Sequence, residues 1–237
     1  MTKKSIAIVA LFLAFAGVEV WAGDSASFVD LGFSADGKVY MFAQYGVESV
    51  SLKPWAELFV VDVPRNTFFK DGVKKNVYNA PVLAGQDGAG AFHRLLSENA
   101  GLAAKYKVDH LRQGTPLYLL VSDGSIVAPA SKEPATIDFR DFESGTSYKA
   151  TLVPYVEGNG ASLASSFYIS VEKTLVNGSL KKYTVGTPGF KRSGVMSYTI
   201  NRVISAPKDG SLIFVIEMRK TGVRGPDLRY MVEAFRL

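Results

Sequence analysis

The sequence predicts a mainly β fold of antiparallel sheets, sandwich-like or propeller-like, with one inserted α-helix. Three observations predict it. Apolar and aromatic residues fill both alternating phases of several short runs, as in strands covered on both faces. Turn pairs such as Asp-Gly and Asn-Gly separate these runs at short intervals. Only residues 89–106 carry apolar side chains at the three- and four-residue spacings of a helix.

The first 22 residues are typical of a secretory signal peptide. Lys3 and Lys4 precede an apolar stretch over residues 6–17, and Val20-Trp21-Ala22 resembles a cleavage site. The alternative is a retained anchor, but the apolar stretch is shorter than the roughly 20 residues that span a bilayer, and Glu19 interrupts it. We expect cleavage after Ala22 and a periplasmic or secreted protein with no stable membrane span.

The remaining chain, residues 23–237, is interpreted as a single β-rich domain. It has no cysteine, so a hydrophobic core rather than disulfides must stabilise it. Removal of residues 1–22 takes away Lys3, Lys4 and Glu19 and lowers the formal net charge from +5 to +4. This mild excess, without a block of like charges, is typical of a solvated surface. We therefore expect no nucleic-acid partner.

The domain begins with a predicted three-stranded antiparallel unit at residues 28–63. Residues 28–33 and 39–44 predict two strands, and Ser34-Ala35-Asp36-Gly37 predicts the tight turn between them, because Gly37 can adopt a positive φ. After a polar loop, the run Glu-Leu-Phe-Val-Val-Asp-Val at residues 57–63 predicts the third strand.

A similar unit recurs at residues 200–235. Asp209-Gly210 precedes an apolar strand as Asp36-Gly37 does, and Gln44 and Glu217 each fall seven residues after the turn glycine. A proline introduces the last strand of both units. We interpret the two units as related repeats.

The region between the two units contains the helix and the other strands. Asp71-Gly72 predicts a hairpin before the helix at about residues 89–106, and residues 117–122 predict a buried strand after it. Residues 136–203 predict several antiparallel strands, and Asn177-Gly178 is the clearest hairpin signal among them.

Histidines and glycines form no recognisable catalytic, metal or cofactor site. His93 falls on the polar side of the predicted helix and His110 in the loop after it, without the spacing of a zinc motif. The glycine-rich stretch 85–90 precedes the helix, but its spacing matches neither the dinucleotide fingerprint nor the phosphate loop. A loop with Asp87 at the helix start explains the same residues, and we expect no cofactor.

The carboxylates at residues 138–143 are the remaining candidates for catalysis or calcium binding. On a strand, Asp138 and Asp141 point to opposite faces, while Glu143 shares a face with Asp141. This pattern favours an exposed edge strand beside Arg140 over a carboxylate pair.

The loops of the two repeats are the predicted binding surface. If the repeats are neighbours, these loops converge into a polar patch with an exposed aromatic side chain. The alternative is that the aromatic residues belong to the core and that the charges are solvated. The candidate ligand-binding residues are Tyr45, Trp55, Glu57, Glu217, Arg219, Arg224, Asp227 and Arg229.

Two resemblances carry further expectations. Residues 33–40 (Phe-Ser-Ala-Asp-Gly-Lys-Val-Tyr) with residues 57–62 resemble a blade hairpin of the Ser-Pro-Asp-Gly-Lys repeats in propellers similar to the periplasmic Tol-translocation protein, with alanine in place of proline. Residues 31–47, 56–63 and 225–229 resemble a bacterial family of predicted secreted proteins of unknown function. The second resemblance implies export and a β-rich fold.

Two functions follow from these patterns. The first is a non-catalytic periplasmic or secreted module that binds a protein or a cell-envelope component through the repeat loops. The alternative is an extracytoplasmic hydrolase, in which two carboxylates about 5 to 10 Å apart would share one cleft. Its candidate residues are Asp138, Asp141, Glu217 and Asp227.

Overall fold

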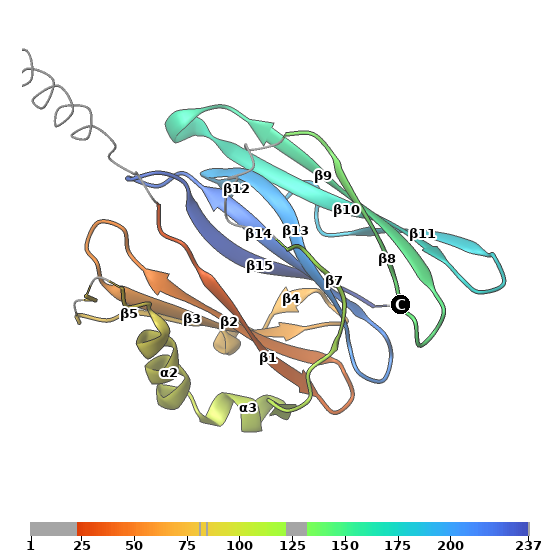
Figure 1. The fold of residues 1–237 in the computed structure, drawn as a ribbon, viewed down its shortest axis with the longest axis horizontal. Coiled ribbons are helices and arrows are strands. Elements are labelled where there is room, and N and C mark those ends of the chain that lie inside the picture. The colour runs from red at the N-terminus through yellow and green to blue at the C-terminus, as the bar shows by residue number, and fades with distance from the viewer. Residues whose placement is uncertain (1–22, 81, 84, 122–131, 237) are drawn as a thin grey trace, which may run out of the picture.

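A computed structural model of the chain describes residues 23–236 apart from 81, 84 and 122–131. The predicted signal peptide, residues 1–22, lies outside the described residues. Three antiparallel sheets are stacked in layers, and two helices cover the outer face of one of them (Figure 1). The described strands stack as sheets and do not close into a propeller, so the sandwich-like alternative is correct.

The N-terminal sheet has the strand order β4-β3-β2-β1-β6, with β5 paired to β3. Its first three strands form the predicted three-stranded unit, joined by the Asp36-Gly37 turn and a longer loop. The strands are β1 (Ser27–Ser34), β2 (Val39–Val47), β3 (Pro54–Asp62), β4 (Thr67–Phe68), β5 (Lys74–Val77) and β6 (Val108–Asp109).

The central sheet has the strand order β15-β14-β13-β7, and the outer sheet has the order β11-β10-β9-β8, with β12 paired to β10. The central sheet consists of β7 (Thr115–Leu119), β13 (Val195–Ser205), β14 (Leu212–Lys220) and β15 (Asp227–Phe235). The outer sheet consists of β8 (Ala135–Arg140), β9 (Ser147–Glu157), β10 (Ala164–Thr174), β11 (Leu180–Val185) and β12 (Arg192–Ser193).

The central sheet is buried on both faces, as the apolar runs predict. Along β14, Leu212, Phe214 and Ile216 pack toward the outer sheet. The alternate residues Ile213 and Val215 pack toward the N-terminal sheet. All five side chains are fully buried because successive side chains of a strand point to opposite faces.

The N-terminal sheet is covered by the central sheet on one face and by helices on the other. Phe42 of β2 packs toward the central sheet, whereas Met41 packs toward α2 (Ala89–Glu98) and α3 (Gly101–Tyr106). The helical segment predicted at residues 89–106 is confirmed in its bounds, but a turn at Asn99 and Ala100 divides it into two helices. Asn99 ends α2, and its side-chain Nδ2 donates a hydrogen bond of 2.9 Å to the Leu95 carbonyl.

Two further sequence predictions need correction, and two are confirmed. Asp71-Gly72 lies in a 3-10 turn, and the strands on either side of it both pair with β3 rather than with each other. The strand predicted at 117–122 is β7, an edge strand whose Leu119 is 56% exposed rather than buried. The Asn177-Gly178 turn joins β10 to β11 as predicted, and residues 135–140 form the predicted edge strand β8.

The two predicted repeats are both three-stranded antiparallel meanders, β1-β2-β3 and β13-β14-β15. They pack against each other through a shared apolar cluster that includes Phe33, Phe59, Ile204 and Val215. Within the described part of the chain, no helix is long and apolar enough to cross a membrane.

Candidate functional site

Three adjoining clefts follow the outer edge of β15, the last strand of the central sheet, and we call them together the β15 groove. The middle cleft has a volume of ≈ 420 Å³ and is lined by residues of all three sheets. It shares Glu57, Lys75 and Arg229 with a second cleft of ≈ 420 Å³ beside Trp55. It shares Phe68, Phe190, Arg192 and Met231 with a third cleft of ≈ 330 Å³ beside Glu233.

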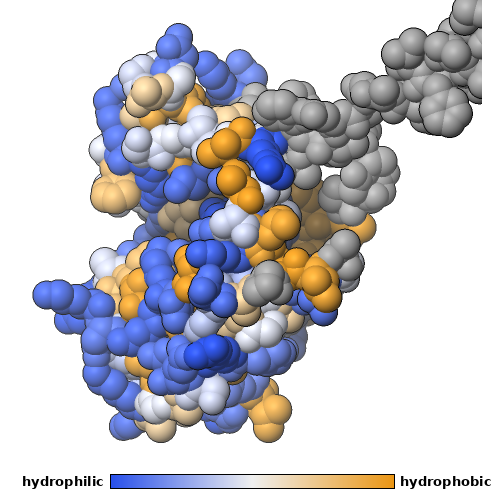
Figure 2. All heavy atoms as spheres, turned by 90° about the vertical axis from the view of Figure 1, so that its left-hand side faces the viewer, coloured by the Kyte–Doolittle hydropathy of each residue, from blue (hydrophilic) through white to orange (hydrophobic). Residues whose placement is uncertain are grey.

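Aromatic side chains form the apolar part of the groove. Phe42 and Phe59 are buried and stack with ring centroids 4.7 Å apart, and Phe68 lies 5.3 Å from Phe59. Phe68 is 41% exposed and Phe190, which precedes β12, is 58% exposed. Figure 2 shows hydrophobic side chains gathered across the middle of one face, between more hydrophilic regions above and below. The groove therefore offers aromatic surface to a ligand.

Gln44 joins the two meanders inside the groove. Its side chain is almost fully buried on β2, and its Nε2 donates a 2.7 Å hydrogen bond to Glu57 Oε2. Its Oε1 accepts a 2.7 Å hydrogen bond from the backbone N–H of Tyr230 on β15. Lys75 donates to the other oxygen of Glu57 at 2.8 Å. Both polar ends of Gln44 and both oxygens of Glu57 are therefore occupied.

One end of the groove is closed by a cluster of Asp24, Trp55 and Arg229, which we call the Asp24 cluster. Asp24 Oδ2 accepts hydrogen bonds from Trp55 Nε1 at 2.8 Å and from Arg229 Nη2 at 2.6 Å. The guanidinium of Arg229 lies 4.2 Å from the centre of the Trp55 ring. Burial raises the pKa of the Asp24 carboxyl, and the nearby Arg229 opposes this effect.

The other end of the groove contains Asn66, Glu233 and Arg192. Asn66 Nδ2 donates to Glu233 Oε2 at 2.5 Å, and Asn66 Oδ1 accepts from the backbone N–H of Ala234 at 2.6 Å. Arg192 forms an ion pair with Glu233 at 3.4 Å and lies over the Phe190 ring. Burial raises the pKa of the Glu233 carboxyl above its usual value. The hydrogen bond from Asn66 and the charge of Arg192 oppose this effect only in part.

The structure brings only part of the predicted binding residues together. Trp55, Glu57 and Arg229 line the groove, but Trp55 is only 5% exposed, so the expectation of an exposed tryptophan is wrong. Tyr45 stacks on Phe92 of α2 with centroids 5.8 Å apart and packs with the helix-covered cluster.

The remaining predicted residues lie outside the lining of the groove. Glu217 and Arg219 form an ion pair of 3.5 Å on β14, and Asp227 accepts a hydrogen bond from the backbone N–H of Asp24. Arg224 is exposed in the turn before β15. Most of the eight candidates lie on strands, whereas the sequence predicts them in loops. The difference arises because β2, β3, β14 and β15 extend further than their apolar cores.

The carboxylates that could support catalysis are not gathered at the groove. Asp138 lies on the edge strand β8, and Asp141 accepts a 2.6 Å hydrogen bond from Ser144 in the turn after it. Burial raises the pKa of Asp141, but hydrogen bonds from Ser144 and Glu143 outweigh it and lower this pKa. Within the described ranges, no cluster of three or more His, Asp or Glu side chains could hold a metal ion.

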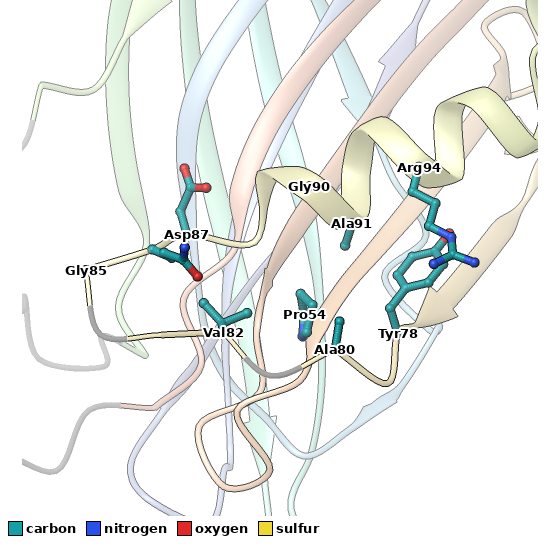
Figure 3. Close-up of a pocket in the computed structure, with 10 residues that line it drawn as sticks. Pro54, Tyr78, Ala80, Val82, Gly85, Asp87, Gly90, Ala91 and Arg94 are labelled. Atoms are coloured by element: carbon teal, nitrogen blue, oxygen red, sulfur yellow. The ribbon is translucent and has the colours of Figure 1, made fainter.

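The glycine-rich stretch before α2 lines a separate cleft of ≈ 650 Å³ (Figure 3). Asp87 Oδ1 accepts a hydrogen bond from the backbone N–H of Ala89 at 3.0 Å, as expected for a residue at a helix start. A Cβ on Gly88 would lie 2.3 Å from the carbonyl oxygen of Gly46, so close packing explains this glycine. Arg94 is paired with Glu98. Among the described residues that line this cleft, Arg94 is the only cation, so none of them offers an unpaired positive charge to an anion.

Comparison with known proteins places the chain in a family. The model of the family described as Predicted secreted protein (DUF2259) matches residues 41–236. The chain belongs to this family. A search of curated proteins and a search of solved structures each gave no match. The family description agrees with the predicted export of a periplasmic or secreted protein, whereas the resemblance to Tol-type propeller blades is not confirmed.

The residues that shape the groove were mostly missed in the sequence. Asp24 lies two residues after the predicted cleavage site, and no local pattern links it to Trp55 or Arg229. Phe68 and Phe190 belong to short strands or turns that carry no periodic signal. In the sequence, Gln44 is distinguished only by its offset from the turn glycine, although a polar residue inside an apolar strand is itself a signal of a buried hydrogen bond.

Proposed function

We propose that this exported protein is a non-catalytic binding module and that its ligand, a protein or a cell-envelope component, occupies the β15 groove. The observation that carries the proposal is the pair of exposed aromatic side chains, Phe68 on β4 and Phe190 in the loop before β12, which line the same cleft. Exposed aromatic surface in a concave site is typical of ligand recognition.

The rigidity of the walls supports the proposal. Each wall belongs to a sheet buried on at least one face, and Gln44 and Asn66 connect the N-terminal sheet to β15 by hydrogen bonds. A groove held in this way needs little ordering when a ligand enters, which lowers the entropic cost of binding.

The hydrolase alternative receives less support. None of its four candidate carboxylates, Asp138, Asp141, Glu217 and Asp227, is among the residues that line the three clefts of the groove. Hydrolysis by paired carboxylates needs two of them at one cleft. We therefore favour binding.

The experiment compares retention of envelope components by three immobilised proteins of residues 23–237. The groove variant carries Phe68→Ser and Phe190→Ser, and the matched control carries Phe142→Ser, since Phe142 is 86% exposed and lies beyond the edge strand of the outer sheet. We expect the native protein and the control to retain the same component and the groove variant to lose it. Equal retention by all three folded proteins would contradict the proposal.

A further inference from the structure

We infer that the ligand of the β15 groove is an amphiphile with a single acyl chain and an anionic head, a carboxylate or a phosphate. This inference rests on the proposed binding function and names the chemistry of its ligand. It depends on the apolar lining, the polar groups already occupied, and the charges of the middle cleft.

The apolar lining suits a flexible chain. Phe59 and Phe68 form an aromatic wall, and Met218, Met231 and Phe190 also line the middle cleft. Methionine is unbranched and polarisable, so it adapts to a chain of variable conformation. The three clefts adjoin one another, which gives the groove an elongated form.

Gln44 and Glu57, which lie between the two meanders in the middle of the groove, are already paired, which disfavours a sugar or an extended peptide. Gln44 and Glu57 form a hydrogen bond with each other. Glu57 also accepts a hydrogen bond from Lys75, and Gln44 accepts one from the backbone N–H of Tyr230. A sugar would find few free partners for its hydroxyls.

Strand addition to the edge of β15 is also disfavoured. The backbone N–H groups of Leu228, Tyr230 and Ala234 donate to the Asp24 carbonyl, Gln44 and Asn66 respectively. A peptide would have to displace these partners before it could pair with the edge.

The charges of the middle cleft favour an anion. Its lining contains four cationic side chains, Lys75, Arg192, Lys220 and Arg229, against the single carboxylate of Glu57. Three of these cations have carboxylate partners, on Glu57, Glu233 and Asp24. Lys220, the last residue of β14, forms no ion pair with any residue that the structure describes. We assign Lys220 as the residue that holds the anionic head.

Trp55 provides the readout. It is the only tryptophan in residues 23–237 and lines the cleft that adjoins the middle one. The probes are 2-bromododecanoic acid and the matched alcohol 2-bromododecanol, because a bromine atom beside the head lies near Trp55 when Lys220 holds that head, and bromine near an indole quenches its fluorescence. Vesicles of phosphatidylcholine with brominated phosphatidylglycerol form a separate arm.

We expect saturable quenching by the acid, with an affinity at least five times that for the alcohol. Lys220→Gln should lower the affinity for the acid by about five-fold, which corresponds to about 1 kcal/mol, and leave that for the alcohol unchanged. The control Lys181→Gln, on an exposed strand of the outer sheet, should change neither. Phe190→Ser should weaken both ligands.

Each outcome separates the inference from the proposed function. Quenching by the dispersed acid supports a free amphiphile with a single chain, whereas quenching by the vesicles alone would overturn the single chain, because phosphatidylglycerol has two. Equal affinities for acid and alcohol, or no effect of Lys220→Gln, would overturn the anionic head. If no probe quenches while Phe68→Ser with Phe190→Ser still abolishes retention of an envelope component, the inference fails and the binding function stands.

Discussion

Replacement of Arg229 by methionine tests the Asp24 cluster. Methionine keeps an apolar stem against the Trp55 ring but removes the charge that pairs with Asp24 at 2.6 Å. Asp24 is 4% exposed, so its carboxylate would remain buried without a cation. Loss of one partner of a buried ion pair costs about 3 to 5 kcal/mol, and partial exposure of the Arg229 side chain favours the low end, about 3 kcal/mol. For a chain of this length, the expected fall in Tm is about 6 to 12 °C.

The pH dependence gives the same prediction a second readout. The pKa of Asp24 is already raised from 3.8 by burial, and loss of Arg229 should raise it further. A raised pKa in the folded state means that the folded protein holds this proton more tightly than the unfolded chain. The loss of unfolding free energy caused by Arg229→Met is therefore largest at neutral pH, where Asp24 is charged, and becomes smaller as the pH falls toward 3.8.

The assay is urea unfolding at pH 7.5 and pH 4.5, followed by Trp55 fluorescence. The double variant Asp24→Asn with Arg229→Met should recover stability at pH 7.5, because an amide can still accept the Trp55 hydrogen bond without a buried charge. Arg224→Met, at an exposed position in the turn before β15, is the control. A loss below about 0.5 kcal/mol for Arg229→Met, or a loss that is the same at both pH values, would refute this reasoning.

Two further substitutions test local features of the fold by urea unfolding. Gly37→Ala and Gly178→Ala both place alanine at a positive φ, but only at Gly37 would the new Cβ meet a carbonyl oxygen of the facing turn, at 2.6 Å. The Gly37 variant should lose at least about 1 kcal/mol more, and equal losses would exclude a clash. Asn66→Gly keeps the positive φ but removes the partner of Glu233 and of the Ala234 N–H, so we expect a loss of about 1 to 3 kcal/mol. An unchanged stability would show that these groups find other partners.

Turns were the most predictable part of the fold because their chemistry is local. At the first turn, Ser34 Oγ donates to Asp36 Oδ1 at 2.7 Å, the N–H of Gly37 donates to the Ser34 carbonyl, and Gly37 has a φ of +72°. All three groups lie within four residues of sequence. The break between the helices had a local signal as well, since Asn99 is a favourable residue at a helix C-terminus, but the continuing apolar pattern through Tyr106 obscured it.

The groove was less predictable because it depends on which sheets are stacked. Apolar residues on both phases of β2 and β14 indicate coverage of both faces, but not which element provides it. Trp55 was expected at the surface because its partner Asp24 lies 31 residues earlier, and Arg229 lies 205 residues after Asp24. Phe190 reaches the groove from a turn beside the outer sheet, so its role depends on the packing of all three layers.

The pairing of residues 24–26 with β15 links the groove to the final arrangement of the chain. Leu228 N–H donates to the Asp24 carbonyl at 2.7 Å, and Ala26 N–H donates to the Leu228 carbonyl at 3.2 Å. Contacts across such a separation carry the entropic cost of closing a long loop. The edge of β15 that borders the groove is held by these bonds, Gln44 and Asn66. A ligand that binds this edge therefore stabilises the same contacts that complete the fold, so occupancy of the groove and pairing of these segments should strengthen each other.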